Sequence, residues 1–214
     1  MTILKWNGYA HMALSFCTGC SNDFACRPTC WARRMATRQA AMERARKATL
    51  LGVAQNEHFE PYPYLRQLER RGDPFWPALH LDVMARWDKK LAGMKTGKRI
   101  ALNFMSDIGS AGEWDVYGMD RTVAQRVPFF MAIDVQFEIR SFCLRHPRHT
   151  FLVLTKRPEA LISPWPANVH VGVSASTAAE ARERMGHLSR VECGLRWASL
   201  EPWDDTDANV FGEA

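Results

Sequence analysis

The sequence predicts a parallel α/β fold, and two features of it support this prediction. Short apolar runs that end in polar residues recur along the chain, and segments with helical spacing separate them. Such alternation is typical of strand–helix–strand units that build a parallel sheet. The apolar runs are continuous rather than alternating, as expected of strands buried on both faces. A chain of 214 residues allows one domain of ordinary size, so we expect a single domain over 1–214.

Three helices, separated by irregular structure, are expected between residues 31 and 94. Residues 31–50 are rich in Ala, Met, Arg and Gln, which favour a helix. One face of this helix carries apolar residues at helical spacing, namely Trp31, Met35, Met42 and Ala45. Residues 51–78 hold four prolines and two glycines, so we expect irregular structure with one short helix over 64–70. The spacing of apolar residues predicts a further helix over 79–94.

The second half of the chain is expected to alternate between strands and helices. Apolar runs predict strands over 98–107, 149–158, 168–176 and 195–202. A long helix is expected over 122–146, with a bend near Pro128. Thr177 and Glu180 have the spacing of a capping box, which predicts that a helix over 177–190 begins there.

Polar side chains stand at the ends of all four predicted strands. The C-terminal ends of parallel strands meet at one edge of a sheet, where such folds bind ligands. We therefore expect these side chains to form one site, although each alone is equally compatible with a loop cap or a solvated residue. Its candidate members are Asn103, Ser106, Asp107, Thr155, Lys156, Arg157, Ser174, Ser176, Ser199 and Glu201.

Four of the six cysteines lie within fourteen positions, at Cys17, Cys20, Cys26 and Cys30. Clustered cysteines in a reducing compartment are typical of metal ligation or redox chemistry. These spacings suit both zinc and an iron–sulfur cluster, and the sequence leaves both open. It also leaves open whether Cys17 or Cys20 is the first ligand.

The formal excess of positive charge lies in the same segment. Residues 17–50 contain seven cations and two acids, which gives this segment a net charge of +5. The net charge of the whole chain is also +5, so the charges of the remaining residues cancel. An ordinary solvated helix face would explain this charge. Arginine also matches phosphate oxygens, so the segment is a candidate for contact with phosphate.

Several motifs resemble the phage-associated three-cysteine-motif family, whose members are radical-SAM-like proteins of phages and prophages. The matching motifs are Trp6-Asn7, Thr18-Gly19-Cys20, Cys26, Cys30-Trp31-Ala32, Met105-Ser106-Asp107, Leu154-Thr155-Lys156-Arg157-Pro158, Val171-Gly172-Val173-Ser174 and Ser199-Leu200-Glu201-Pro202. They extend over nearly the whole chain in the order typical of the family.

This resemblance implies a fold, a cofactor set and roles for particular residues. The implied fold is a partial, open TIM-like βα barrel of about six parallel strands with an N-terminal cysteine-rich loop, since the family continues with further strands beyond Glu-Pro. Cys20, Cys26 and Cys30, with Cys17 as an extra candidate, would hold a 4Fe–4S cluster, and S-adenosylmethionine would bind its open iron. The implied catalytic residues are Asp107, Lys156, Arg157 and Glu201. The implied cofactor-binding residues are Asn103, Ser106, Thr155, Ser174 and Glu201.

We therefore expect a radical-SAM-type enzyme that cleaves S-adenosylmethionine reductively and modifies a nucleic acid or a nucleotide. The alternative is a non-enzymatic nucleic-acid-binding or regulatory phage protein that zinc or a cluster stabilises. A third hypothesis is a degenerate family member that binds a phage-encoded partner protein. No apolar run approaches the ~20 residues of a membrane helix. The N-terminus has no secretory signal, so we expect a cytoplasmic protein of the host bacterium.

Overall fold

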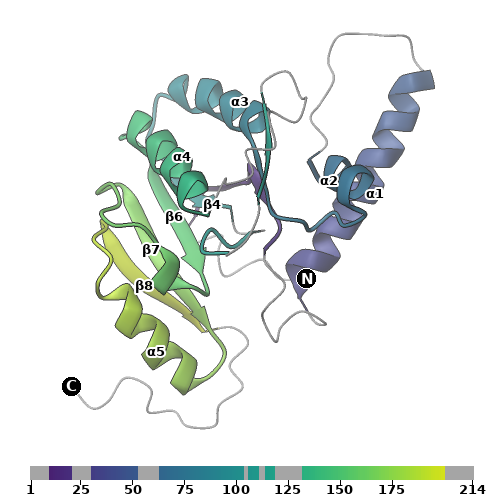
Figure 1. Cartoon of the computed structure of the whole chain (residues 1–214). Coiled ribbons are helices and arrows are strands. Elements are labelled where there is room, and N and C mark those ends of the chain that lie inside the picture. Colours follow the sequence, from purple (N-terminus) through teal and green to yellow (C-terminus); the bar gives the residue numbers. More distant parts are fainter. Residues whose placement is uncertain are drawn as a thin grey trace.

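The computed structural model has a five-stranded parallel sheet at its centre (Figure 1). It describes residues 10–20, 30–52, 63–103, 106–110, 114–118 and 132–200. The strands of this sheet are β1 (Met12–Leu14), β4 (Arg99–Leu102), β6 (Thr150–Thr155), β7 (Val169–Ala175) and β8 (Leu195–Leu200). They lie in the order β1-β4-β6-β7-β8, and every neighbouring pair is parallel. Because all five strands are parallel, their C-terminal ends share one edge of the sheet.

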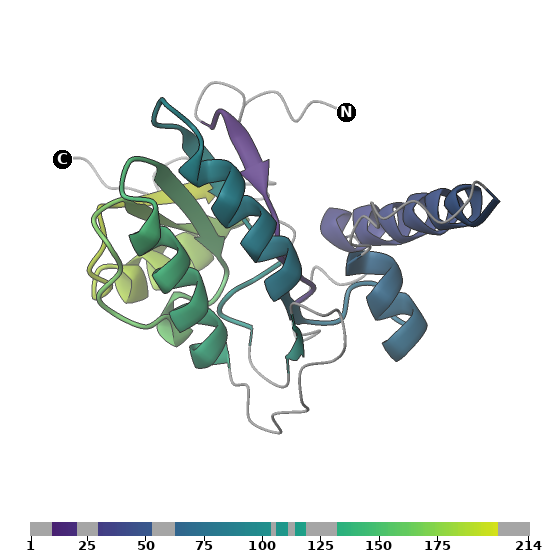
Figure 2. The same ribbon diagram turned by 90° about the horizontal axis from the view of Figure 1, so that it is seen from above.

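Three helices cover one face of this sheet, namely α3 (Leu81–Ala92), α4 (Ala132–Arg145) and α5 (Ala178–Leu188). Alternate strand residues such as Phe151, Val153 and Val171 share a buried core with side chains of α3 and α4. Ala175, which lies on the same face as Val171, packs against residues of α5. Figure 2 shows α3 and α4 lying side by side over the strands. The apolar contacts thus hold the helices on a single side of the sheet.

A second, smaller sheet contains β2 (Cys17–Thr18), β3 (Ala78–His80) and β5 (Asp115–Tyr117). Strand β3 is antiparallel to β2 and parallel to β5. The backbone N–H of His80 donates to the Phe16 carbonyl over 2.8 Å, which links this sheet to the segment after β1.

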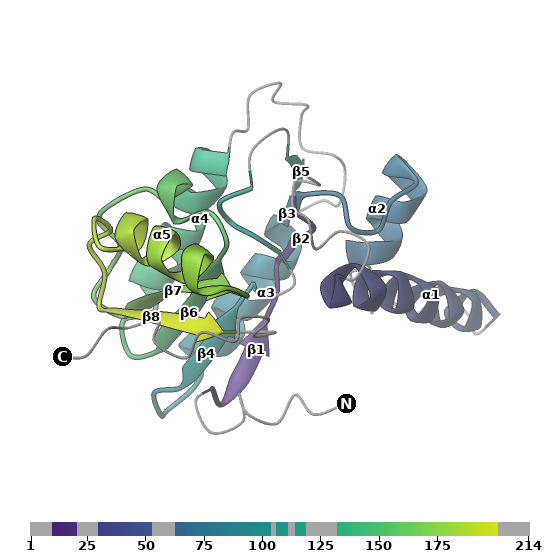
Figure 3. The ribbon, with the colours of Figure 1, turned by 90° about the horizontal axis from the view of Figure 1, so that it is seen from below.

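Two further helices, α1 (Trp31–Gly52) and α2 (Pro63–Arg71), pack against each other and project from the side of the sheets (Figure 3). Their contact is made of small and aromatic side chains, namely Ala32, Ala36, Ala40, Tyr64 and Phe75. The predicted apolar face of α1 is wrong, because Met42 on that face is 51% exposed. The alanines, spaced four residues apart, are buried instead, and their small side chains let α2 approach closely.

The predicted α/β class is confirmed, and the predicted strands at 98–107, 149–158, 168–176 and 195–202 contain β4, β6, β7 and β8. Where an open barrel of about six parallel strands was expected, the structure has a parallel sheet of five strands, and no closed barrel is present in the part of the chain that it describes. The predicted helices correspond to α1, α2, α3, α4 and α5, although residues 122–131 of the expected helix 122–146 lie outside the described ranges.

The prediction that residues 79–80 begin a helix is wrong. Leu79 and His80 belong to β3, and α3 begins at Leu81. Pairing of β3 with β5 and the bond between His80 and Phe16 hold these two residues extended. Local apolar spacing therefore gave way to a long-range backbone pairing.

Candidate functional site

The loop after β4 begins the polar edge of the large sheet. Asn103 follows the strand with a φ of 57°, in the left-handed region that Asn tolerates. Its Oδ1 atom accepts hydrogen bonds from the backbone N–H groups of Phe16, at 3.0 Å, and Cys17, at 3.2 Å. Its Nδ2 atom is buried and has no hydrogen-bond partner among the described residues. Asn103 thus joins β4 to the segment that leads into the cysteines.

Asp107 ties this loop to the end of β6. Its Oδ1 atom accepts from the Thr155 hydroxyl over 2.5 Å and from the backbone N–H of Gly109 over 3.0 Å. Its Oδ2 atom accepts from the backbone N–H of Lys156 over 2.9 Å. The Thr155 Oγ1 atom in turn accepts from the backbone N–H of Arg157 over 2.9 Å. The carboxylate of Asp107 therefore fixes the backbone that carries Lys156 and Arg157.

Ser174 and Ser199 are paired neighbours at the ends of β7 and β8. The Ser174 carbonyl accepts a hydrogen bond from Arg184 of α5. Arg184 also forms an ion pair of 2.9 Å with Glu180, whose other carboxylate oxygen accepts from the backbone N–H of Ser176. The Thr177 hydroxyl accepts from the backbone N–H of Glu180, as the predicted capping box requires. These contacts place the start of α5 beside the end of β7.

The cysteine segment starts at this same edge. Gly19 forms a parallel bridge with Ser106, and Cys20 is the next residue. The φ of Gly19 is +72°, and a Cβ atom there would overlap the Phe75 carbonyl oxygen. Glycine therefore lets the chain turn tightly between the sheet edge and residues 75–76, where a side chain would not fit.

The cysteines of this segment lie in two different surroundings. Cys20 and Cys30 are partly buried, and both pack against the alanine and aromatic cluster between α1 and α2. Cys17 is fully buried in the main core instead, and this burial raises the pKa of its thiol. Cys26 lies outside the described residues, and no group of three metal-ligating side chains occurs within the ranges that the structure describes. The structure thus groups Cys20 with Cys30 rather than with Cys17.

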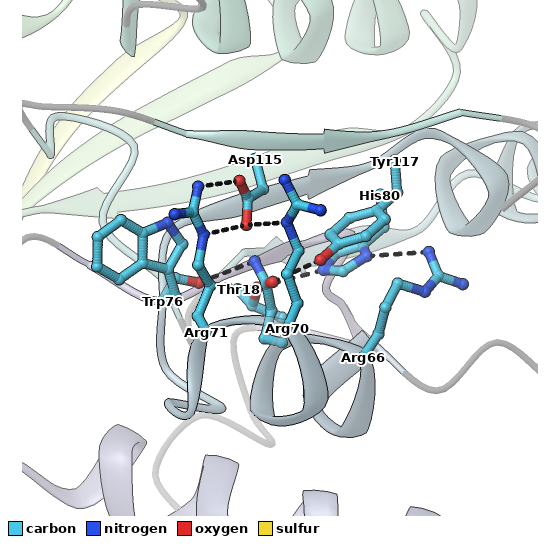
Figure 4. A network of polar contacts seen from close by, with 9 residues as sticks. Thr18, Arg66, Arg70, Arg71, Trp76, His80, Asp115 and Tyr117 are labelled. Carbon is cyan, nitrogen blue, oxygen red and sulfur yellow. Dashed lines mark hydrogen bonds and ion pairs between the residues drawn. The ribbon is translucent and has the colours of Figure 1, made fainter. Parts of the chain in front are cut away.

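A buried polar network joins α2 to the small sheet (Figure 4). Asp115 forms ion pairs with Arg71, at 2.6 Å, and with Arg70, at 3.3 Å. The Tyr117 hydroxyl donates to the Gln67 Oε1 atom over 2.6 Å, and burial raises the pKa of Tyr117 to about 12. Because its main members are partnered with one another, this network anchors α2.

His80 extends the network as a neutral side chain. Its imidazole is fully buried, and this desolvation, together with the charge of Arg66, lowers its pKa well below the usual value. Arg66 can only donate, so the Nδ1 atom, 3.5 Å from it, accepts and the Nε2 atom carries the proton. The Nε2 atom then donates to the Thr18 hydroxyl over 3.2 Å. His80 also stacks on the Tyr117 ring at a centroid distance of 4.9 Å.

Sequence reasoning located most of the sheet edge but missed this network. The structure brings Asn103, Ser106, Asp107 and Thr155 together through the bonds described above, whereas Glu201 lies outside the described residues. The apolar spacing predicts a helix at His80, and it predicts no strand at β5, which carries Asp115 and Tyr117. One signal in the sequence is the pair Arg70 and Arg71 at the end of α2. They precede an aromatic and proline-rich segment, and arginines that are partly buried there need acidic partners.

Among the described residues, none of the helices has both the length and the apolar character of a membrane span.

The chain resembles one family of proteins over nearly its whole length. No curated protein and no solved structure matches the chain. A family model described as "Protein of unknown function (DUF5131)" matches residues 3–206, which is nearly the whole sequence. The chain therefore belongs to the DUF5131 family of proteins of unknown function.

Proposed function

We propose that the protein is a radical-SAM-like iron–sulfur enzyme that cleaves S-adenosylmethionine reductively and modifies a nucleic acid. The observation that carries the proposal is the bridge between Gly19 and Ser106, which starts the cysteine segment at the polar edge of the parallel sheet. Parallel α/β sheets bind ligands at this edge. The one-sided helix layer and the chain-order strands also support an open TIM-like barrel wall.

The donor set suits an iron–sulfur cluster. Nine residues lie between Cys20 and Cys30, and both cysteines pack against one small cluster. With Cys26 between them, three thiolates would hold the cluster and leave one iron open to S-adenosylmethionine. Cys17 suits this role poorly, since burial in the apolar core disfavours its thiolate. When bound, such a cluster supplies the single electron for reductive cleavage.

The residues of the sheet edge have distinct roles in this proposal. Asp107 and Thr155 act as positioning residues, because their hydrogen bonds hold the backbone of Lys156 and Arg157. These two cations would pair with a carboxylate or phosphate of a ligand. The buried Nδ2 atom of Asn103, which no described residue engages, is available to an oxygen atom of the ligand.

Anaerobic reconstitution with iron and sulfide tests the proposal. We expect a brown protein with about four iron atoms per chain, broad visible absorption and bleaching by dithionite. Its electron-paramagnetic-resonance spectrum should change when S-adenosylmethionine is added. A colourless protein with one tightly bound zinc ion would refute the proposal and support a zinc-stabilised nucleic-acid-binding protein.

Single cysteine variants test the ligand assignment. Cys20→Ala, Cys26→Ala and Cys30→Ala should each lose most of the bound iron. Cys17→Ala should retain it, and Cys193→Ala is a matched control at a distant cysteine after α5. Full iron content in Cys30→Ala, or its loss in Cys17→Ala, would show that the assignment is wrong.

A further inference from the structure

The outward side of α1 is strongly basic, and we propose that it binds duplex DNA along the major groove. This inference rests on the proposed function, for which it names the class of substrate. The surface, called here the arginine face, consists of Arg34, Arg38, Arg44 and Arg46, which are all exposed. It belongs to a helix that projects from the sheets with α2 on its inner side (Figures 1 and 2).

Glu43, the carboxylate in this part of α1, lies against α2 and also interacts electrostatically with Arg46. Glu43 is only 8% exposed, and its Oε2 atom accepts from the backbone N–H of Leu65 over 2.7 Å. Glu43 thus caps the N-terminal turn of α2 and stabilises the helix pair. Between residues 32 and 46, where the structure describes the side chains, Glu43 is the one acid, and it is not exposed. The face therefore carries concentrated positive charge toward solvent.

Arginines that face the body of the protein are arranged differently. Arg33 forms an ion pair of 3.0 Å with Asp73, and Arg66 forms one of 3.0 Å with Asp82. In contrast, Arg38 and Arg44 form no ion pair with any residue in the described ranges. Acids of neighbouring segments thus neutralise the inward arginines Arg33 and Arg66. Arg38 and Arg44 have no such partner within the described ranges and can pair with an anionic partner. A nucleic acid backbone supplies such an anion at regular intervals.

The shape of the face favours the major groove of duplex DNA. Arg34, Arg38, Ala41 and Ala45 follow one another at spacings of four, three and four residues, so they form one stripe along the helix. The alanines in its C-terminal half allow close approach, and Arg44 and Arg46 lie on either side of the stripe. A B-DNA major groove, about 12 Å wide, admits one helix and has a row of phosphates on each side. The deep, narrow groove of duplex RNA does not admit it.

The position of α1 connects this surface to the proposed reactive centre. The helix begins immediately after Cys30, one of the proposed cluster ligands. Its four outward arginines span about 18 Å at the rise of an α-helix. DNA bound along this length would run directly past the end of the cysteine segment.

Fluorescence anisotropy with a labelled 20-base-pair DNA duplex tests the proposal on the full chain over a range of salt concentrations. The double variant Arg38→Gln/Arg44→Gln should bind at least tenfold more weakly than the unmodified protein. The slope of log K against log salt should fall by about 1 to 2, because each lost phosphate contact removes about 0.9. The control Arg182→Gln/Arg190→Gln removes the same charge at exposed positions in and after α5, on the far side of the sheet. It should bind nearly normally.

A third variant tests the groove itself without changing the charge. Ala41→Trp places a bulky side chain at the centre of the stripe, where Ala41 is exposed and the fold has room for it. It should weaken duplex binding several-fold. Normal binding by Ala41→Trp, equal losses in the Arg182/Arg190 control, or tighter binding of single-stranded DNA or RNA than of the duplex would each overturn the proposal.

Measurement of iron content on the same samples separates the two proposals. Normal iron loading without duplex binding would refute the arginine face and leave the proposed function standing. Duplex binding that depends on Arg38 and Arg44, in a protein that takes up no iron, would do the reverse. The substitutions lie outside the cysteine segment, so cluster loading should be the same in all variants.

Discussion

Substitution of Glu43 should make the protein more stable at neutral and basic pH. Burial raises the pKa of this carboxyl to about 7 from its usual value of 4.5, even though backbone hydrogen bonds and nearby arginines oppose the shift. A carboxyl with a raised pKa favours the folded state below about pH 4.5, and this contribution is lost as the pH rises to about 7. The difference between these two pKa values corresponds to about 3 kcal/mol. Screening by solvent reduces this to about 2 kcal/mol.

The variant Glu43→Gln keeps an oxygen acceptor for the backbone N–H of Leu65 but does not titrate. Its free energy of unfolding relative to the unmodified protein should therefore increase by about 2 kcal/mol between pH 4.5 and pH 8. Urea denaturation at a series of pH values measures this difference. Glu183→Gln, at an exposed position in α5, is the control and should change stability by less than about 0.5 kcal/mol. A constant difference between Glu43→Gln and the unmodified protein at all pH values would refute the reasoning.

Three further substitutions test contacts that hold the site. Gly19→Ala should lower the free energy of unfolding by more than about 2 kcal/mol and should lower the iron content, because φ is positive there and the new Cβ atom would overlap a backbone oxygen. Urea denaturation measures this loss, and an unchanged midpoint would contradict it. Asp107→Asn should destabilise the sheet edge by about 1–3 kcal/mol and speed amide exchange at Lys156, whereas unaltered exchange there would argue against a positioning role. Asp115→Asn should cost about 3 kcal/mol, measured by urea denaturation, since two arginines of α2 lose their partner; a loss below about 0.5 kcal/mol would show that the network does not anchor α2.

The large sheet could be predicted because its signals are local. Strands β6 and β7 are continuous apolar runs, and each ends in polar residues at the sheet edge. The capping pattern at Thr177 and Glu180 likewise acts within a single turn of helix. Such features depend on the residues themselves and their near neighbours, so the sequence alone indicates them.

The short strands of the small sheet could not be predicted in this way. Strands β2, β3 and β5 have two or three residues each, and they exist because distant segments pair with them. The buried face of α1 was missed for a related reason. Its partner is the short helix α2, for which small alanines are better suited than the larger methionines that simple apolar spacing favours.

The separate environments of Cys17 and Cys20 also follow from tertiary contacts. Cys17 of β2 pairs with Leu79 of β3, and this pairing places Cys17 in the core. Two residues later, Gly19 turns the chain toward Ser106 and leaves Cys20 at the sheet edge. Spacing along the chain does not reveal that these two cysteines have different surroundings, whereas burial and strand pairing do.

The anchoring of α2 connects the sheet edge, the cysteines and the arginine face. Asp115 holds the C-terminal end of α2 through two arginines, and Glu43 joins the other end of α2 to α1. Helix α1 in turn begins at the residue after Cys30, so the position of this cysteine depends on how α2 is held. The proposed cluster site and the proposed DNA surface thus both depend on the position of α2. A substrate that displaced α1 would therefore also displace Cys30 and, with it, the cysteine segment. The ion pairs between α2 and Asp115 of the small sheet oppose such a displacement, in addition to the apolar contacts of the helix pair.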